Sequence, residues 1–256
     1  MWRLKPKRSF SKHLPSSESA MPATTLTNDI YADYSVTLIQ RIALTVSVIV
    51  CLALAWWILV GSGAAVIGHL FDRRWMRGDP ARSLCLALAL TIYFARLLLT
   101  QFVFLKRAMS WNEAATVGCW LLCLYLWLSL TAATNPAPLG TAAFAGIALF
   151  LVGSWMNSWA EYTRNRWKLR PENRGGLYTL GLYRFTRHPN YLGDVISFSG
   201  LCLISGRWIA APIPVLMLAG FVFVNIPMLD AHLRDHYGRA FDDYAAHTRR
   251  LIPFLY

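Results

Sequence analysis

Charged residues are scarce in this sequence. They make up 15% of its 256 residues, whereas hydrophobic residues make up 56%; soluble domains typically contain about 25% and about 45–50%. This composition excludes a disordered chain, a coiled coil and an ordinary soluble enzyme. Aromatic residues reach 14%, with 11 tryptophans, and such rings are enriched where a membrane meets water. The composition therefore indicates an integral membrane protein.

Several common site motifs are missing as well. The five cysteines lie in apolar runs without a Cys-x-x-Cys pair, so we interpret them as small buried hydrophobic residues and exclude a disulfide framework. Neither the GxGxxG nor the GxxxxGK[ST] pattern occurs, which excludes the usual Rossmann and P-loop sites. His232 and His236 have the spacing of a helical metal pair but no third ligand at a suitable distance. We therefore expect no metal.

Long runs without Asp, Glu, Lys or Arg predict the membrane spans. A spanning helix needs about 20 apolar residues, and the proline-containing segment 135–138 divides the longest run into two helices. We therefore predict an all-α polytopic membrane bundle with about six to seven transmembrane helices. The runs are 42–71, 83–105 (interrupted only by Arg96), 114–160, 195–206 and 208–229.

The distribution of basic residues predicts the orientation. With six spans, most of the 25 lysines and arginines lie on the side of the two termini, and such loops are cytoplasmic in most membrane proteins. We expect a multi-pass protein of a bacterial inner membrane with both termini cytoplasmic, including a disordered tail over residues 1–33. The net charge of +12 is then explained by contact with anionic membrane lipids, and no nucleic acid is expected. No pattern indicates an oligomeric state.

Polar residues concentrate in the C-terminal half. Asn157, Glu161, Arg164 and Lys168 share one face of a helix that leaves the membrane. One interpretation is a solvated helix end with a Glu161–Arg164 ion pair. Asn157 argues against it, because an unpaired amide within an apolar run is costly.

Two motifs follow this helix. The loop 170–176, which contains Arg174, is either a polar connector or a weak cradle for phosphate. The segment 187–194 runs into the next apolar helix and places Asn190 and Asp194 on one face. Asp194 needs a partner near the membrane boundary, and we expect Arg187, the nearest cation in sequence, to provide it. Simple capping of the helix is the alternative.

Two further features are candidates for function. Arg96 lies in the middle of an apolar run, where a charge usually has an inward-facing partner, and Tyr93 is one turn away. An arginine that merely binds backbone carbonyls is the alternative. The segment 230–244 is typical of an amphipathic cytoplasmic helix and carries Arg234 and Tyr237.

These motifs resemble the C-terminal domain of the steroid 5-alpha-reductases and membrane sterol reductases, in order and in spacing. The resemblance covers about residues 150–256, with a weaker match at Tyr93-Phe-Ala-Arg96. The residues that carry it are Asn157 with Glu161, Arg174-Gly-Gly-Leu-Tyr178, Asn190-Tyr-Leu-Gly-Asp194, Phe241-Asp-Asp-Tyr244 and Leu251-Ile-Pro-Phe254. It implies two domains: transmembrane helices on the substrate side over 34–149, and a cofactor-binding domain over 150–256.

The resemblance also implies an activity, which is NADPH-dependent reduction of a carbon–carbon double bond in a steroid-like or other hydrophobic lipid. Tyr93, alone or assisted by Arg96, would then polarise the substrate carbonyl. Cations and amides would hold the cofactor. The expected cofactor-binding residues are Asn157, Glu161, Lys168, Arg174, Arg187, His188, Asn190, Tyr191, Asp194, Arg234 and Tyr237.

The sequence departs from that family in two places. The steroid 5-alpha-reductases pair the tyrosine with a carboxylate from the first helix, but the run 42–71 contains no Asp or Glu. The family arginine before the tail tyrosine has Leu229 at its register. Two alternatives therefore stay open. One is a lipid or isoprenylcysteine-type methyltransferase that uses S-adenosylmethionine, since those enzymes share the Arg-His-Pro element found here at Arg187-His188-Pro189. The other is a non-catalytic lipid-binding membrane protein.

Overall fold

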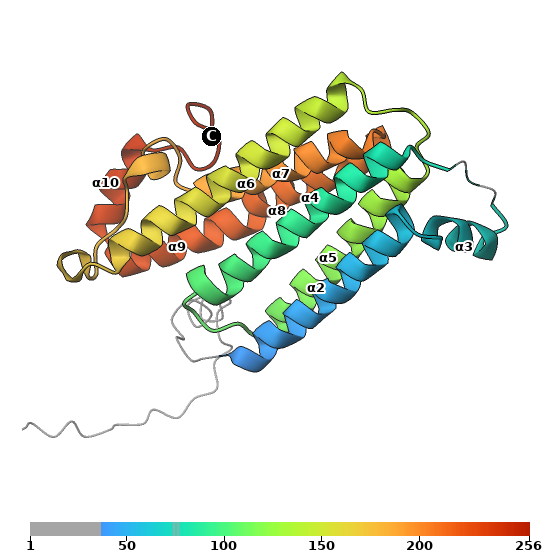
Figure 1. The fold of residues 1–256 in the computed structure, drawn as a ribbon. Helices are drawn as coiled ribbons and strands as arrows, with labels where there is room; N and C mark the ends of the chain where they lie inside the picture. The colour runs from blue at the N-terminus through green and yellow to red at the C-terminus, as the bar shows by residue number, and fades with distance from the viewer. Residues whose placement is uncertain (1–36, 74, 76) are drawn as a thin grey trace, which may run out of the picture.

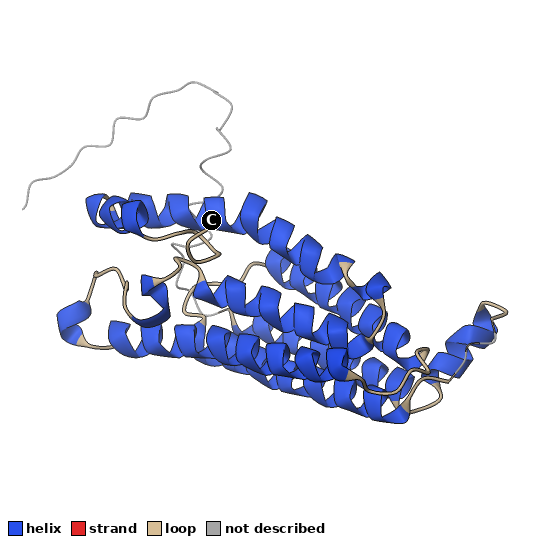
Figure 2. Cartoon of the chain, turned by 90° about the horizontal axis from the view of Figure 1, so that it is seen from above, coloured by secondary structure: helices blue, strands red, loops and turns tan. Residues whose placement is uncertain are grey.

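The computed structural model describes residues 37–256 except 74 and 76, and this part of the chain consists of helices joined by loops, with one isolated bridge between Thr186 and Arg249 (Figures 1 and 2). The tail predicted over residues 1–33 lies outside the described residues. The five longest helices of the described residues are α2 (Leu38–Leu59), α4 (Pro80–Leu99, continued as a π-helical turn at Thr100–Phe104), α5 (Trp111–Ala133), α6 (Thr141–Lys168) and α7 (Pro189–Ser205). The chain is completed by α3 (Gly63–Leu70), α8 (Pro212–Gly220), a second π-helical turn (Phe221–Asn225), α9 (Ile226–Tyr237) and α10 (Arg239–His247).

Five segments are long and apolar enough to cross a membrane, so the chain is an integral multi-pass membrane protein. They are Leu38–Leu59, Pro80–Phe104, Trp111–Ala133, Thr141–Lys168 and Trp208–Tyr237. The apolar run 195–206 predicts the fifth of six helices, with a start at about Tyr191. It is present as α7, but its 17 residues fall short of the usual length of about 20. The break at 135–138 is confirmed, because α5 ends at Ala133 and α6 begins at Thr141.

The structure corrects two helix boundaries. The run 42–71 is divided, because Gly61 and Gly63 fold tightly against Trp57 and leave α3 as a separate short helix. The amphipathic segment expected from Asp230 is continuous with the preceding span. The wide turn at Phe221–Asn225 accommodates Pro227, which lacks an N–H group. The chain breaks at Gly238, whose φ of 53° lies in the left-handed region.

The N-terminal helices α2, α4 and α5 pack through large apolar side chains. Leu86, Leu90, Leu121, Leu124 and Leu128 are all at most 2% exposed and belong to one continuous core. Burial of this kind stabilises the bundle in proportion to the area it covers, without requiring polar contacts.

Helices α6 and α7 pack through glycine instead, and theirs is the most extensive helix–helix interface of the molecule. Gly146 and Gly153 on α6 face Gly200 and Gly193 on α7. A Cβ atom added at Gly193 would lie 2.7 Å from the carbonyl oxygen of Gly153, and one at Gly200 would lie 2.5 Å from that of Gly146. Small residues allow this close backbone approach in membrane helices. We call this contact the glycine seam.

Two arginines, the half-buried Arg41 and the buried Arg82, bind backbone carbonyls at opposite ends of α4. Arg41 donates to the carbonyl oxygens of Gln101 (2.6 Å), Leu105 (3.1 Å) and Arg107 (3.0 Å). Arg82 donates to those of Ile204 (2.6 Å), Ala137 and Pro138. Each guanidinium group thereby satisfies carbonyls at helix ends, which otherwise lack partners.

Candidate functional site

Polar side chains extend the glycine seam at its end nearest the α6–α7 loops. Asn157 follows Gly153 by one turn on α6, and its side-chain amide donates to the backbone oxygen of Asn190 at 3.0 Å. The Asn190 amide in turn donates to Glu161 at 3.1 Å, and Glu161 pairs with Arg164. The predicted face 157–161–164 and the start of α7 are therefore brought together. Asn157 and Glu161 are 8% and 7% exposed, so the solvated helix end is excluded for these two residues.

A second polar group joins α4 to α7. The Arg96 guanidinium binds Asp194 at 2.7 Å, and both side chains are largely buried. The same guanidinium lies 4.8 Å from the ring centre of Tyr93, and Tyr93 packs edge-on against Phe198 of α7. The expectation that Arg187 pairs with Asp194 is wrong. Helix α7 places Asp194 next to α4, whereas Arg187 lies before this helix and pairs with Asp230 of α9.

Asp230 of α9 is the centre of a third group, which sequence reasoning missed. Its carboxylate accepts from Arg187 at 3.0 Å and contacts the His188 ring nitrogen at 2.9 Å. The His188 ring stacks on Tyr191, which stacks on Phe221. Asp230 lies in a polar run after a span and had no visible partner in sequence. The available signal was that Asp230 directly follows Leu229, the position at which the reductases carry an arginine.

The other predicted residues lie on the outer side of these groups. Lys168, at the exposed end of α6, donates to the Tyr237 hydroxyl at 3.1 Å. Arg234 pairs with Asp242 at 2.8 Å, and both side chains are more than half exposed. Arg174 is exposed in its loop. Within the described part of the chain, no group of three or more His, Cys, Asp or Glu side chains could hold a metal ion.

Burial shifts the pKa of several groups that lie beside the site. It raises the pKa of Tyr183 above its ordinary value, and the Arg164 guanidinium opposes that shift. Burial likewise raises the pKa of Tyr244, whose hydroxyl donates to the Tyr183 backbone oxygen at 2.6 Å. For Arg187, burial lowers the pKa, and the Asp230 carboxylate acts in the opposite direction. Both tyrosines therefore remain neutral at physiological pH.

The family model described as "Protein of unknown function (DUF1295)" matches residues 30–248, which is most of the chain. The chain belongs to the DUF1295 family. Its wider similarity is divided between two groups of proteins, the steroid 5-alpha-reductases and the isoprenylcysteine or other O-methyltransferases, and the predicted resemblance is thereby confirmed.

Three relatives illustrate the division. A probable protein-S-isoprenylcysteine O-methyltransferase of Oryza sativa subsp. indica is 26% identical over 118 residues, 44% of this chain and 62% of that protein. A probable O-methyltransferase of Ustilaginoidea virens is 34% identical over 114 residues, 43% and 40%. A steroid 5-alpha-reductase of Solanum lycopersicum is 28% identical over 117 residues, 43% and 41%. The matched segment thus spans less than two thirds of each relative.

Proposed function

We propose that this DUF1295 protein is a membrane-embedded NADPH-dependent reductase of a carbon–carbon double bond in a steroid-like or other hydrophobic lipid. One observation carries the proposal. On α7, Asn190 binds Asn157 and Glu161 of α6, and we call these three residues the amide row. One turn later on α7, Asp194 joins Arg96 and Tyr93 of α4. The α-helical rise separates the two groups by about 6 Å along α7. A row of amides and cations therefore adjoins a buried hydrogen-bond donor, as hydride transfer to an enone requires.

The residues at the amide row fit a dinucleotide. The Asn157 and Asn190 amides can exchange hydrogen bonds with a carboxamide, and Arg164 and Lys168 continue the row on the same helix with positive charge for phosphate. NADPH, when bound, would supply the hydride. Tyr191 and His188 flank the row, with Tyr237 beside Lys168 and Arg174 in the adjoining loop. Arg187 and Arg234, also expected there, are engaged by Asp230 and Asp242.

The buried group of α4 supports the chemistry at the substrate. As hydride reaches the β-carbon of an enone, negative charge develops on the carbonyl oxygen, and a fixed donor in a dry site stabilises that charge. Tyr93 is 7% exposed, and Arg96 keeps its guanidinium against the ring. Asp194 balances the charge of Arg96.

The membrane arrangement fits this role. We propose that α7 completes a bundle of six spans, that the termini and the 169–188 loop are cytoplasmic, and that the substrate enters from the bilayer. Trp155, Trp159 and Tyr162 form an exposed aromatic row on α6, and such rows lie at the membrane–water interface. The amide row, on the same stretch of α6, then lies at the level where a water-soluble cofactor meets a membrane substrate.

The deciding experiment is calorimetric titration of the purified full-length protein with NADPH and, separately, with S-adenosylmethionine. We expect NADPH to bind and Asn190→Ala to weaken binding about tenfold, as for loss of one hydrogen bond in a buried site. Ser199→Ala is the matched control, because its hydroxyl donates to the Val195 backbone oxygen within the same helix. Equal NADPH affinity in the Asn190→Ala variant would contradict the assigned site.

The methyltransferase is the second candidate, because several of the curated relatives are named as methyltransferases. It predicts binding of S-adenosylmethionine alone. Replacing Asn157 and Glu161 together by alanine separates the candidates, since the amide row serves the dinucleotide. If the double variant binds its cofactor as the wild type does, the reductase proposal fails. Binding of neither cofactor by the folded protein would favour a non-catalytic lipid-binding role.

A further inference from the structure

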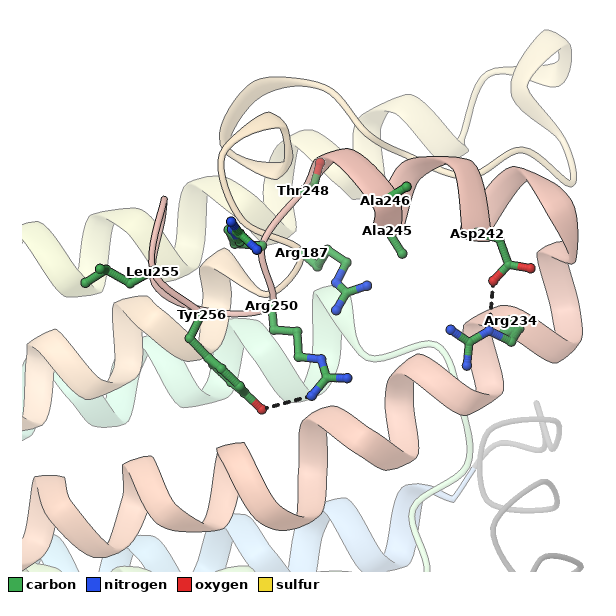
Figure 3. A pocket seen from close by; sticks show the side chains of 10 residues that line it. Arg187, Arg234, Asp242, Ala245, Ala246, Thr248, Arg250, Leu255 and Tyr256 are labelled. Atoms are coloured by element: carbon green, nitrogen blue, oxygen red, sulfur yellow. Dashed lines mark hydrogen bonds and ion pairs between the residues drawn. The ribbon is translucent and has the colours of Figure 1, made fainter.

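A cavity of about 480 Å³ lies between α9, α10 and the C-terminal segment (Figure 3). In the close-up, Leu255 lies at one end and the Arg234–Asp242 pair at the other, and the side chains of Arg187 and Arg250 lie between them. Its lining joins strongly basic and apolar side chains: Arg187, Arg234, Arg249, Arg250, Leu255 and Tyr256.

Positive charge exceeds negative charge at this cavity. Four guanidinium groups line it, while the carboxylates within salt-bridge distance of them in the described residues are those of Asp230 and Asp242. Asp230 is shared, because Arg187, at 3.0 Å, and Arg250, at 3.9 Å, both approach it. The Nε atom of Arg187 is buried and has no hydrogen-bond partner. A buried donor without a partner is costly, so the cavity suits an anion with several acceptor oxygens.

The apolar residues beside the cavity identify the kind of anion. Phe254 and Leu255 are 85% and 78% exposed, and they directly follow the basic pair 249–250 and a short turn. A phospholipid combines a phosphate that accepts from arginine with acyl chains that cover apolar side chains. The basic cavity suits the phosphate, and the apolar residues at its border suit the acyl chains of the same lipid molecule.

The cavity is separate from the amide row. None of its lining residues belongs to α6 or α7, the helices that carry Asn157, Glu161 and Asn190. Asp230 lies between the cavity and the amide row. It binds Arg187, which lines the cavity, and His188, whose ring stacks on Tyr191 of α7. Occupation of the cavity can therefore be measured independently of cofactor binding.

We propose that this cavity binds the phosphate headgroup of an anionic phospholipid. Arg249 and Arg250 contribute most of the accessible charge, since both are exposed at its rim, and Arg187 donates from within. The bound lipid would hold the α9–α10 corner against the bilayer. This inference does not depend on the reaction proposed for the amide row.

The test uses full-length protein in a neutral detergent, titrated with short-chain phosphatidylglycerol and with phosphatidylcholine of the same chains. We expect the wild type to prefer phosphatidylglycerol and the Arg249→Gln/Arg250→Gln variant to bind it about thirtyfold more weakly, from two lost contacts to an anionic headgroup. Both residues are exposed, so the variant should fold. The matched control is Arg166→Gln/Arg170→Gln, which removes the same charge from exposed positions outside the cavity.

Three results would overturn the proposal. They are equal affinity of the wild type for the two lipids, equal loss in both double variants, and loss of NADPH affinity together with lipid affinity in the Arg249→Gln/Arg250→Gln variant. The last result would place the cavity within the cofactor site. Retained NADPH binding with lost lipid preference supports the cavity and leaves the proposed reaction intact, so failure of either proposal can be recognised by itself.

Discussion

The α2–α4–α5 half of the bundle and the α6–α7 pair use opposite ways of packing. In the first, leucines and tyrosines fill the space between helices, and side chains determine the fit. In the second, glycines remove the side chains, and the two backbones meet directly. The difference teaches where a site can form. Interlocking apolar side chains tolerate repacking. Direct backbone contact, in contrast, fixes the positions of the residues about one turn away on each helix, which here are Asn157 on α6 and Asn190 on α7.

The buried ion pair between the two regions should give the largest effect when broken. Asp194→Ala leaves the Arg96 charge without a partner and is expected to lower the free energy of unfolding by about 3–5 kcal/mol. Asp242→Ala, in an exposed pair, is the matched control and should change it by less than about 1 kcal/mol. The measurement is reversible unfolding in mixed detergent micelles.

A double variant tests the cause of that effect. Asp194→Leu with Arg96→Met removes both charges and should recover most of the stability lost by Asp194→Ala, because no buried charge remains unpaired. If the double variant is as unstable as the single one, the ion pair does not account for the loss.

Two neighbouring tyrosines, Tyr93 of α4 and Tyr125 of α5, should separate catalysis from packing. Tyr93→Phe is expected to lower kcat about hundredfold without changing NADPH affinity, because it removes the donor to the developing oxyanion. Tyr125→Phe removes a hydrogen bond to the Leu90 backbone oxygen and should lower stability by about 1 kcal/mol while kcat changes little. NADPH absorbance with an enone lipid that the wild type reduces gives both rates. Equal kcat values for the two variants would contradict the role of Tyr93.

Alanine at a glycine of each region should separate the two ways of packing. In Gly153→Ala the new Cβ atom would overlap the carbonyl oxygen of Gly193, and we expect a loss of about 1–3 kcal/mol with weaker cofactor binding as Asn157 shifts. In Gly118→Ala the nearest atom is the Ser47 hydroxyl oxygen at 3.2 Å, and alanine's helix propensity offsets the contact. Equal stability of the two variants would show that the seam is not close-packed in solution.

Much of the fold could be predicted from the sequence. Runs without charge located the five spans and α7, because hydrocarbon requires both apolar length and satisfied backbone. The boundaries at Gly61 and Gly238 were missed. The first depends on how Gly61 packs against Trp57, and the second on the turn at Gly238 that starts α10. Hydropathy contains no information on either contact.

The residues of the site were easier to predict than their partners. Asn157, Glu161 and Asn190 come together because helical periodicity places them on facing sides of α6 and α7. Asp194 was paired with Arg187 by nearness in sequence, yet it binds Arg96, which is 98 residues away. Such a contact depends on the packing of α4 against α7. The seven-residue spacing of Gly146 with Gly153 and of Gly193 with Gly200 was the available signal for the α6–α7 contact.

The glycine seam also has a genetic consequence. Every amino-acid replacement at Gly146, Gly153, Gly193 or Gly200 adds a Cβ atom where a backbone atom already lies. Leucines of the N-terminal half, in contrast, can exchange with isoleucine or methionine at little cost. Across natural variants of this protein, the apolar residues of α2 and α5 should therefore vary among residues of similar size, while these four glycines stay unchanged.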